Sequence, residues 1–179
     1  MLNAINTLLV VVDVQGKLAH LMHNRESLFK HLKTAIEGAR VLDLPILATE
    51  QYPEGMGSTI PEIASLLTDV MPISKTSFSC CGSEAFMAAL KQIGRYQVLL
   101  AGIEAHVCVE QTALDLIENG YEVQVLSDAV SSRDPENRAI AFQRMRDAGA
   151  AITSTEAALF EILRKSDTPA FKQILNLVK

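Results

Sequence analysis

Three polar residues stand where apolar runs of the sequence end. Asp13 follows "LLVVV", Lys75 follows "MPIS" and Cys108 lies just past "VLLAGIEA". Each one alone has an ordinary structural explanation, because an aspartate often caps a turn, a lysine is usually solvated and a lone cysteine often packs in a core. Together they form a chemically complete set: a carboxylate can take the proton of a thiol, the thiol can attack a carbon atom, and an ammonium group can stabilise both anions.

The position of Cys108 favours this nucleophilic chemistry. The residue is expected near the front of a helix that follows a strand, and the partial positive charge of a helix N-terminus favours a thiolate. Backbone N–H groups of the turn and of the first helical residues could then hold the oxyanion of a tetrahedral intermediate. We therefore expect the site to perform acyl or carbamoyl transfer to the thiol.

The elements that must position these residues follow from the apolar pattern. "LLVVV" and "VLLAG" lack polar alternation, which is typical of parallel strands covered by helices on both faces. Strand-like runs alternate with helical stripes, so we predict an α/β protein with a three-layer, doubly wound, Rossmann-like fold and a mostly parallel six-stranded sheet. The predicted strands are Thr7–Val12, Pro45–Thr49, Pro72–Lys75, Val98–Ile103, Glu122–Leu126 and Ala150–Ile152.

Helix signals complete the pattern. Asn119-Gly120 is predicted to end one helix, and Asp134 is predicted to cap the start of another that opens with Pro135. The amphipathic segment after Pro169 could pack on the body of the protein or on a neighbouring subunit. In a doubly wound sheet, ligands bind outside the carboxyl ends of the strands, near the point where the strand order reverses. The predicted helical stripes are Leu28, Leu32, Ala35, Ile36, Ala39 and Leu42, then Val109, Ala113, Leu116 and Ile117.

Composition narrows the possible partners and cofactors. The 179 residues, 49% of them hydrophobic, predict a single domain over 1–179. A net charge of -5 with scattered basic residues disfavours nucleic acid as a partner. The first apolar run lacks a basic flank and is far shorter than a membrane-spanning helix, so we expect neither a signal peptide nor a membrane segment, a cytoplasmic protein and no membrane partner. The first strand is not followed by a G-x-G-x-x-G motif, so we predict no nucleotide cofactor. No metal motif accompanies the His20/His23 pair, so we also predict no metal and therefore no cofactor.

Three motifs carry a resemblance to a known family. "VVDVQ" with Asp13, "SKTSFS" with Lys75 and "GIEAHVCVEQTALD" with Cys108 resemble the signatures of the isochorismatase-like cysteine hydrolases, the superfamily of nicotinamidases and N-carbamoylsarcosine amidohydrolases. Their order and spacing match over roughly residues 8 to 162. The resemblance implies that Cys108 is the nucleophile, Asp13 its proton acceptor and Lys75 the stabilising cation.

The resemblance also implies an oxyanion hole. Family members have a non-proline cis peptide in the turn before the nucleophile, which corresponds to Glu104-Ala105 here, and the N–H groups of Glu104 and Cys108 would face the oxyanion. Loops at the same strand ends supply candidate substrate-binding residues, although His106 could instead cap the helix or contact another subunit. These candidates are Gln15, Gln51, Tyr52, Phe78 and His106.

Two departures from better-known members narrow the implied reaction. Nicotinamidases have an aspartate and several histidines after the second strand, whereas "ATEQYPEGMGSTIPEI" has no histidine, which implies a metal-independent enzyme. Within this segment, "TEQYPEGMG" resembles the corresponding sequence of the isochorismatase-domain-containing branch of the superfamily. Isochorismatases that cleave a vinyl ether do not depend on a cysteine nucleophile, so Cys108 favours hydrolysis of a small amide, ureide or related C–N bond through a thioester.

Two other functions remain open at this point. The protein could be a redox or thiol-sensing protein that pairs Cys108 with Cys80 or Cys81. It could also be a non-enzymatic assembly protein that retains the hydrolase fold. Superfamily members are commonly oligomers, so the resemblance implies a homo-oligomer that takes a small-molecule substrate.

Overall fold

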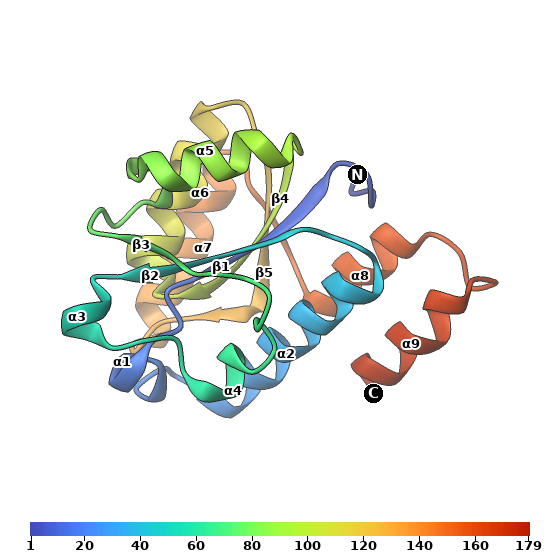
Figure 1. Ribbon diagram of the computed structural model, residues 1–179, viewed down its shortest axis with the longest axis horizontal. Coiled ribbons are helices and arrows are strands. Elements are labelled where there is room, and N and C mark those ends of the chain that lie inside the picture. Colours follow the sequence, from blue (N-terminus) through green and yellow to red (C-terminus); the bar gives the residue numbers. More distant parts are fainter.

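A six-stranded sheet lies between two layers of helices (Figure 1) in the computed structural model, which describes all residues from Met1 to Lys179. The strand order is β3-β2-β1-β4-β5-β6, and every neighbouring pair is parallel. The predicted α/β doubly wound fold is therefore confirmed. The strands are β1 Thr7–Val12, β2 Ile46–Gln51, β3 Ile73–Lys75, β4 Gln97–Ile103, β5 Glu122–Ser131 and β6 Ala151–Thr153.

Most predicted strands agree with the structure within one or two residues, but β5 is longer than predicted. The expected strand ended at Leu126, because the polar residues Ser127 and Asp128 interrupt its apolar run. β5 instead continues to Ser131, after a register irregularity against β4 between Leu100 and Gly102. Backbone pairing with β4 thus extends the strand past residues whose side chains gave no strand signal.

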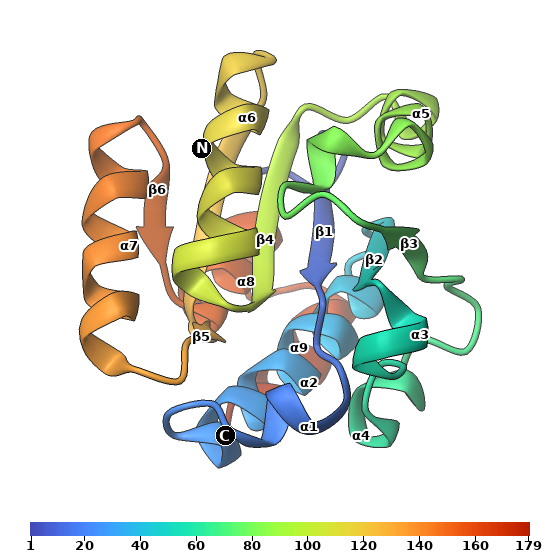
Figure 2. The ribbon, with the colours of Figure 1, turned by 90° about the vertical axis from the view of Figure 1, so that its left-hand side faces the viewer.

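Helices cover both faces of the sheet (Figures 1 and 2). Helices α2 and α8 pack on one face and α5, α6 and α7 on the other, while α1, α3 and α4 are short. A π-helical turn, Ala105–Val109, leads directly into α6. The helices are α1 Gly16–His20, α2 Arg25–Val41, α3 Pro53–Met56, α4 Pro61–Ala64, α5 Glu84–Ile93, α6 Glu110–Glu118, α7 Pro135–Asp147, α8 Thr155–Leu163 and α9 Pro169–Val178.

The sheet separates two apolar cores, which explains its uninterrupted apolar strands. In β1, Leu9 and Val11 pack into the core under α2 and α8, whereas Leu8, Val10 and Val12 pack into the core under α5, α6 and α7. Both sets of side chains are removed from water, so alternation with polar residues would bury polar groups without partners. The predicted helical stripes of α2 and α6 face these two cores.

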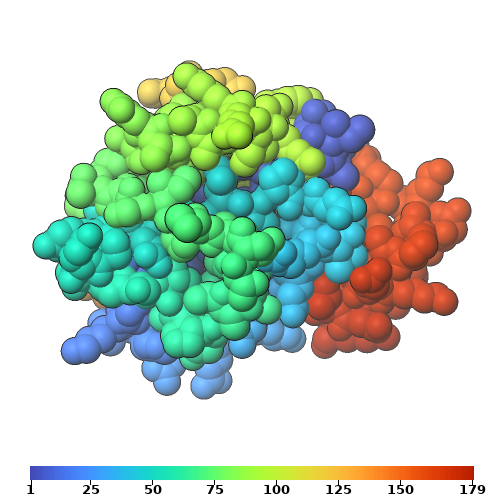
Figure 3. Space-filling model, in the orientation of Figure 1, coloured from blue at the N-terminus to red at the C-terminus, as the bar shows by residue number.

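The predicted helix ends are confirmed. Asp134 accepts a hydrogen bond from the Glu136 N–H at the start of α7, and Asn119 is the C-cap of α6. The C-terminal helix α9 packs on α2 and α8 of its own chain, with Ile174 fully buried. Figure 3 shows the C-terminal segment in red at the end of the molecule opposite α3. None of the helices is long and apolar enough to cross a membrane.

Gly102 allows β4 to lie close to β1 just before both strands end. Its φ is +120°, and a Cβ added to it would lie 2.1 Å from the Val12 carbonyl oxygen. Gly102→Ala is therefore expected to lower the free energy of unfolding by about 2–5 kcal/mol, from backbone strain and overpacking together. Urea unfolding measures this, with Gly94→Ala as the control, because a Cβ at Gly94 meets nothing within 4 Å. Equal stability of the two variants would contradict the prediction.

Candidate active site

The three predicted catalytic residues meet at one edge of the sheet. The chain winds from β1 through β2 to β3 on one side and from β4 through β5 to β6 on the other, so the strand order reverses between β1 and β4. Asp13 directly follows β1, Lys75 ends β3, and Cys108 lies in the π-helical turn after β4. The structure thus brings together residues that are far apart in the sequence.

Lys75 and Asp13 form a buried ion pair. Lys75 Nζ lies 2.6 Å from Asp13 Oδ2, and the lysine side chain is fully buried. Nζ also donates to Gln51 Oε1 at 2.7 Å and to the carbonyl oxygens of Ser77 and Phe78 at 3.1 and 3.0 Å. These acceptors compensate the ammonium group for the water that it loses on burial.

Asp13 is held by β2 and presents its carboxylate to Cys108. Its backbone is left-handed, with φ 49°, and its N–H donates to the Thr49 carbonyl oxygen at 3.2 Å. Thr49 Oγ1 in turn donates to Asp13 Oδ1 at 2.7 Å. The Asp13 carboxylate lies close enough to Cys108 that its charge and its hydrogen-bonding side chain both raise the pKa of the thiol. The carboxylate therefore lies between the ammonium group and the thiol, as a proton acceptor must.

The expected help of a helix N-terminus towards a Cys108 thiolate is outweighed by the surroundings of the thiol. Burial, together with the charge and hydrogen bonding of Asp13, raises the pKa of the Cys108 thiol to about 12, because Lys75 offsets only part of these effects. Cys108 also lies within the π-helical turn rather than at the first residue of a helix, so the helix N-terminus contributes less than expected. At pH 7 a thiol with this pKa is about one part in 10⁵ thiolate.

The raised pKa predicts the pH dependence of Cys108 alkylation. Only the thiolate reacts, so the rate constant with iodoacetamide should rise about tenfold per pH unit from about pH 7 to 9.5 without a plateau. Glutathione, whose thiol is unperturbed, is the control and should begin to level off in this range. Peptide mapping by mass spectrometry isolates the signal of Cys108 from those of Cys80 and Cys81. A plateau for Cys108 below about pH 9 would contradict the prediction.

The turn before Cys108 differs in one detail from the turn that the family resemblance implies. The cis peptide bond joins Ile103 to Glu104, one residue earlier than the predicted Glu104-Ala105 bond. The turn contains no proline, so its sequence does not indicate which bond is cis. The Glu104 carbonyl oxygen accepts hydrogen bonds from the N–H groups of Val107 and Val109, which flank Cys108.

Cys108 opens onto a cavity of about 380 Å³, which has mainly apolar walls. Of the predicted substrate-binding residues, Gln51 and Phe78 line it. Sequence reasoning missed half of the lining, because these residues come from separate elements and have no catalytic signature. The lining residues are Asp13, Leu18, Gln51, Met56, Phe78, Ile103, Glu104, Val107, Cys108 and Arg133.

The other predicted substrate-binding residues lie outside this lining. Gln15 is fully buried, accepts a hydrogen bond from the Gln51 N–H and donates to the carbonyl oxygens of Gln51 and Gly57, so it braces two loops. Tyr52 is largely exposed at the start of α3. His106 Nδ1 lies 2.9 Å from Ser132 Oγ. The sequence indicated that these residues follow the ends of the strands. It did not indicate the directions in which their side chains point.

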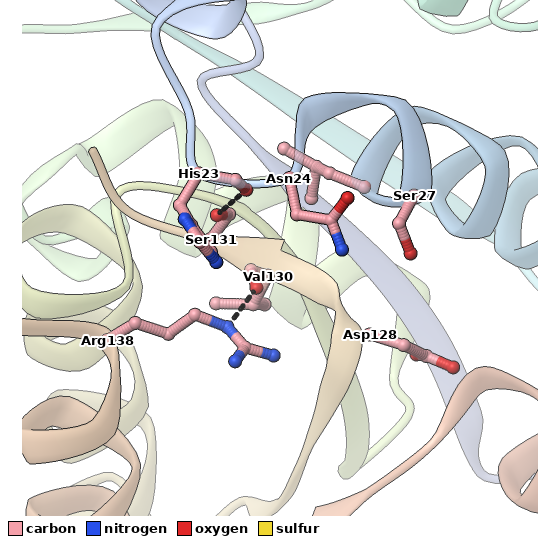
Figure 4. A pocket seen from close by; sticks show the side chains of 8 residues that line it. His23, Asn24, Ser27, Asp128, Val130, Ser131 and Arg138 are labelled. Atoms are coloured by element: carbon pink, nitrogen blue, oxygen red, sulfur yellow. Dashed lines mark hydrogen bonds between the residues drawn. The ribbon is translucent and has the colours of Figure 1, made fainter. Parts of the chain in front are cut away.

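Figure 4 shows a second, polar cavity of about 200 Å³ between α2, β5 and α7. Ser131 Oγ donates to the His23 carbonyl oxygen, and Arg138 Nε donates to the Val130 carbonyl oxygen. His23 lines this cavity, whereas His20 packs edge-on against Phe29. No group of three or more His, Cys, Asp or Glu side chains in the protein is arranged to hold a metal ion. Unlike the cavity at Cys108, this cavity has no thiol in its lining.

The other two cysteines do not favour the thiol-sensing alternative. All three cysteines are free thiols. Burial raises the pKa of Cys80 to about 11 and that of Cys81 to about 12. Redox-sensing thiols are usually exposed and have a lowered pKa, and Cys80 is completely buried.

Comparisons with known proteins agree with the fold. The family model described as the isochorismatase domain matches residues 7–157. The secreted isochorismatase effector Isc1 of Phytophthora sojae is 39% identical over 178 residues, which cover 97% of this chain and 85% of the relative.

Three solved structures are also similar. MAR1 ribonuclease from Caenorhabditis elegans has a TM-score of 0.93 and 39% identity, over 99% of this chain and 91% of that chain. YcaC from Pseudomonas aeruginosa, with hexane-2,5-diol and covalent acrylamide, has a TM-score of 0.92 and 26% identity, over 98% and 90% of the two chains. YcaC from Escherichia coli, an octameric hydrolase of unknown specificity, has a TM-score of 0.92 and 25% identity, over 98% and 89%. The chain belongs to the isochorismatase family and is a hydrolase of the isochorismatase-like superfamily.

Proposed function

We propose that this protein is a metal-independent cysteine hydrolase that cleaves a small amide, ureide or related C–N bond. The observation that carries the proposal is the buried ion pair of Lys75 and Asp13 next to the Cys108 thiol, which lines a cavity with mainly apolar walls. A base, a nucleophile and a compensating cation in contact are what nucleophilic catalysis at neutral pH requires.

In the first half of the reaction, Asp13 takes the proton of the Cys108 thiol while the sulfur attacks the carbonyl carbon. Coupling the two events avoids forming a free thiolate, which the raised pKa of Cys108 makes scarce. The N–H groups of Glu104 and Cys108, in the turn that includes Ala105, stabilise the oxyanion. The tetrahedral intermediate collapses to a thioester as the C–N bond breaks, and the departing amine takes the proton from Asp13.

In the second half, water hydrolyses the thioester. Asp13 takes a proton from the attacking water, the new tetrahedral intermediate expels sulfur, and the proton returns to Cys108 as the acid is released. Lys75 keeps its four hydrogen-bond acceptors throughout. Its positive charge compensates Asp13 whenever the carboxylate is ionised.

The relatives support parts of this proposal. YcaC from Pseudomonas aeruginosa carries covalent acrylamide, a small primary amide with an electrophilic carbon, which agrees with a reactive nucleophile and a cavity of this size. One structural relative is named a ribonuclease. The net charge of -5 and the apolar cavity walls disfavour an RNA substrate here, because RNA binding draws mainly on phosphate contacts.

We further propose that the protein is a cytoplasmic homo-oligomer. The octameric relative supports self-assembly, and three free cysteines fit a reducing compartment, although one relative is named a secreted effector. Mass photometry of the purified protein measures the number of subunits.

The test of the proposed function is a substrate panel read in two ways. Wild-type protein and Cys108→Ala are mixed with small amides, ureides and carbamoyl compounds, and with RNA as a competing substrate class. Intact mass detects an acyl adduct, and an enzymatic assay detects released ammonia. An adduct and ammonia with wild type alone support the proposal. RNA cleavage that persists in Cys108→Ala, without turnover of any amide, would contradict it.

A further inference from the structure

The active-site cavity contains one carboxylate that the proposed mechanism does not use. Glu104 lines the cavity, and only 7% of its side chain is exposed. Its Oε1 accepts hydrogen bonds from the N–H and from Nε of Arg133, both at 3.1 Å. Its Oε2 accepts no hydrogen bond within the protein. Every fully buried side-chain oxygen in the protein has a hydrogen-bond partner, so Oε2 is not fully buried. Oε2 therefore remains accessible from the cavity as a hydrogen-bond acceptor.

The rest of the cavity offers little other polar recognition. Lys75 is committed to four protein acceptors, and the Arg133 side chain is 59% exposed, so its guanidinium group stays largely solvated. The cavity walls contribute mainly aliphatic and aromatic surface from Leu18, Met56, Phe78, Ile103 and Val107.

From this arrangement we infer that the site takes neutral primary amides or terminal ureides with a short apolar group, and that Glu104 Oε2 accepts a hydrogen bond from a substrate N–H. The inference rests on the proposed function and specifies its substrate class. A buried carboxylate gains from an N–H donor and loses from a second anion. The apolar walls would bury the remainder of a small uncharged substrate.

The inference also excludes a class of substrate. A substrate carboxylate in this cavity would lie close to the carboxylates of Glu104 and Asp13, and the fully buried Lys75 has no further hydrogen bond to give. Carbamoylated amino acids and other acidic ureides should therefore bind poorly.

Matched electrophiles test the inference before any natural substrate is known. Acrylamide donates N–H groups and N,N-dimethylacrylamide does not, while both alkylate a thiol in the same way. The rate ratio of the two reagents at Cys108 is divided by their rate ratio with glutathione. We expect this normalised ratio to be about tenfold or more in wild type and to fall to within about twofold of unity in Glu104→Gln.

Glu110→Gln is the matched control for this substitution. Glu110 is also 7% exposed and pairs with a largely exposed arginine, Arg144, but it does not line the cavity. The control should keep the wild-type ratio. An unchanged ratio in folded Glu104→Gln would overturn the inference and leave the proposed nucleophile intact. Failure of both acrylamides to modify Cys108 would overturn the nucleophile, and the inference with it.

A second measurement uses wild-type protein alone and does not depend on the folding of a variant. Isobutyramide, N,N-dimethylisobutyramide and isobutyrate are compared as protectants of Cys108 against iodoacetamide. The primary amide is expected to protect at concentrations about tenfold lower than either of the others. Protection by isobutyrate equal to that by isobutyramide would overturn the inference, because it would assign recognition to a cation.

Discussion

Asp13→Asn is expected to lower amide turnover by about 10³-fold or more while making the Cys108 thiol more reactive towards iodoacetamide. The two effects have opposite signs because Asp13 has two roles. As the base, it accepts the thiol proton during attack, and an amide cannot do so. As a neighbouring anion and hydrogen-bond acceptor, it raises the pKa of Cys108, so its removal shifts the alkylation profile towards lower pH.

Turnover and alkylation are measured on the same preparation, with Asp134→Asn as the control. Asp134 caps α7 by accepting a hydrogen bond from the Glu136 N–H, so the control removes the same charge from a residue that does not line the cavity. It should change neither rate by more than about twofold. A parallel fall of both rates in Asp13→Asn would indicate a damaged fold instead of a lost base. Full turnover in Asp13→Asn would exclude Asp13 as the base of the reaction.

The sequence predicted the parts of the fold that depend on local apolar pattern. β1 was predicted with its observed bounds. All six of its residues are buried, and such a strand appears in the sequence as a nearly continuous apolar run, which is a strong signal. The end of β5 was missed because Ser127 and Asp128 are polar, and Asp128 is used instead to accept hydrogen bonds from Thr155. Such long-range partners leave no periodic signal.

The positions of the three proposed catalytic residues could be predicted from the sequence, whereas the cavity walls could not. Asp13, Lys75 and Cys108 end parallel strands or follow them closely, and the topology alone brings such positions to one edge. Met56, at the end of α3, and Arg133, in the loop before α7, line the same cavity from segments that carry no comparable motif. The pKa of Cys108 could not be predicted from the sequence either, because it depends on how deeply the thiol is buried and on its proximity to Asp13.

Lys75→Met is expected to lower the free energy of unfolding by about 3–5 kcal/mol and to abolish turnover. Methionine fills the volume of the lysine stem, so the loss comes from charge rather than from a void. The substitution leaves the Asp13 carboxylate buried without its cation and removes the donor from Gln51, Ser77 and Phe78. Lys91→Met on the exposed side of α5 is the control and should change stability by less than about 0.5 kcal/mol.

The double variant Asp13→Asn/Lys75→Met separates stability from catalysis. Removing the orphaned carboxylate should restore about 1–3 kcal/mol relative to Lys75→Met, because the two groups contact each other and their effects are not additive. Turnover should stay absent, since neither the base nor the cation is present. Urea unfolding and ammonia release measure the two outcomes. Additive losses of stability would show that the ion pair contributes nothing to the fold, whereas recovered turnover would exclude both residues from the reaction.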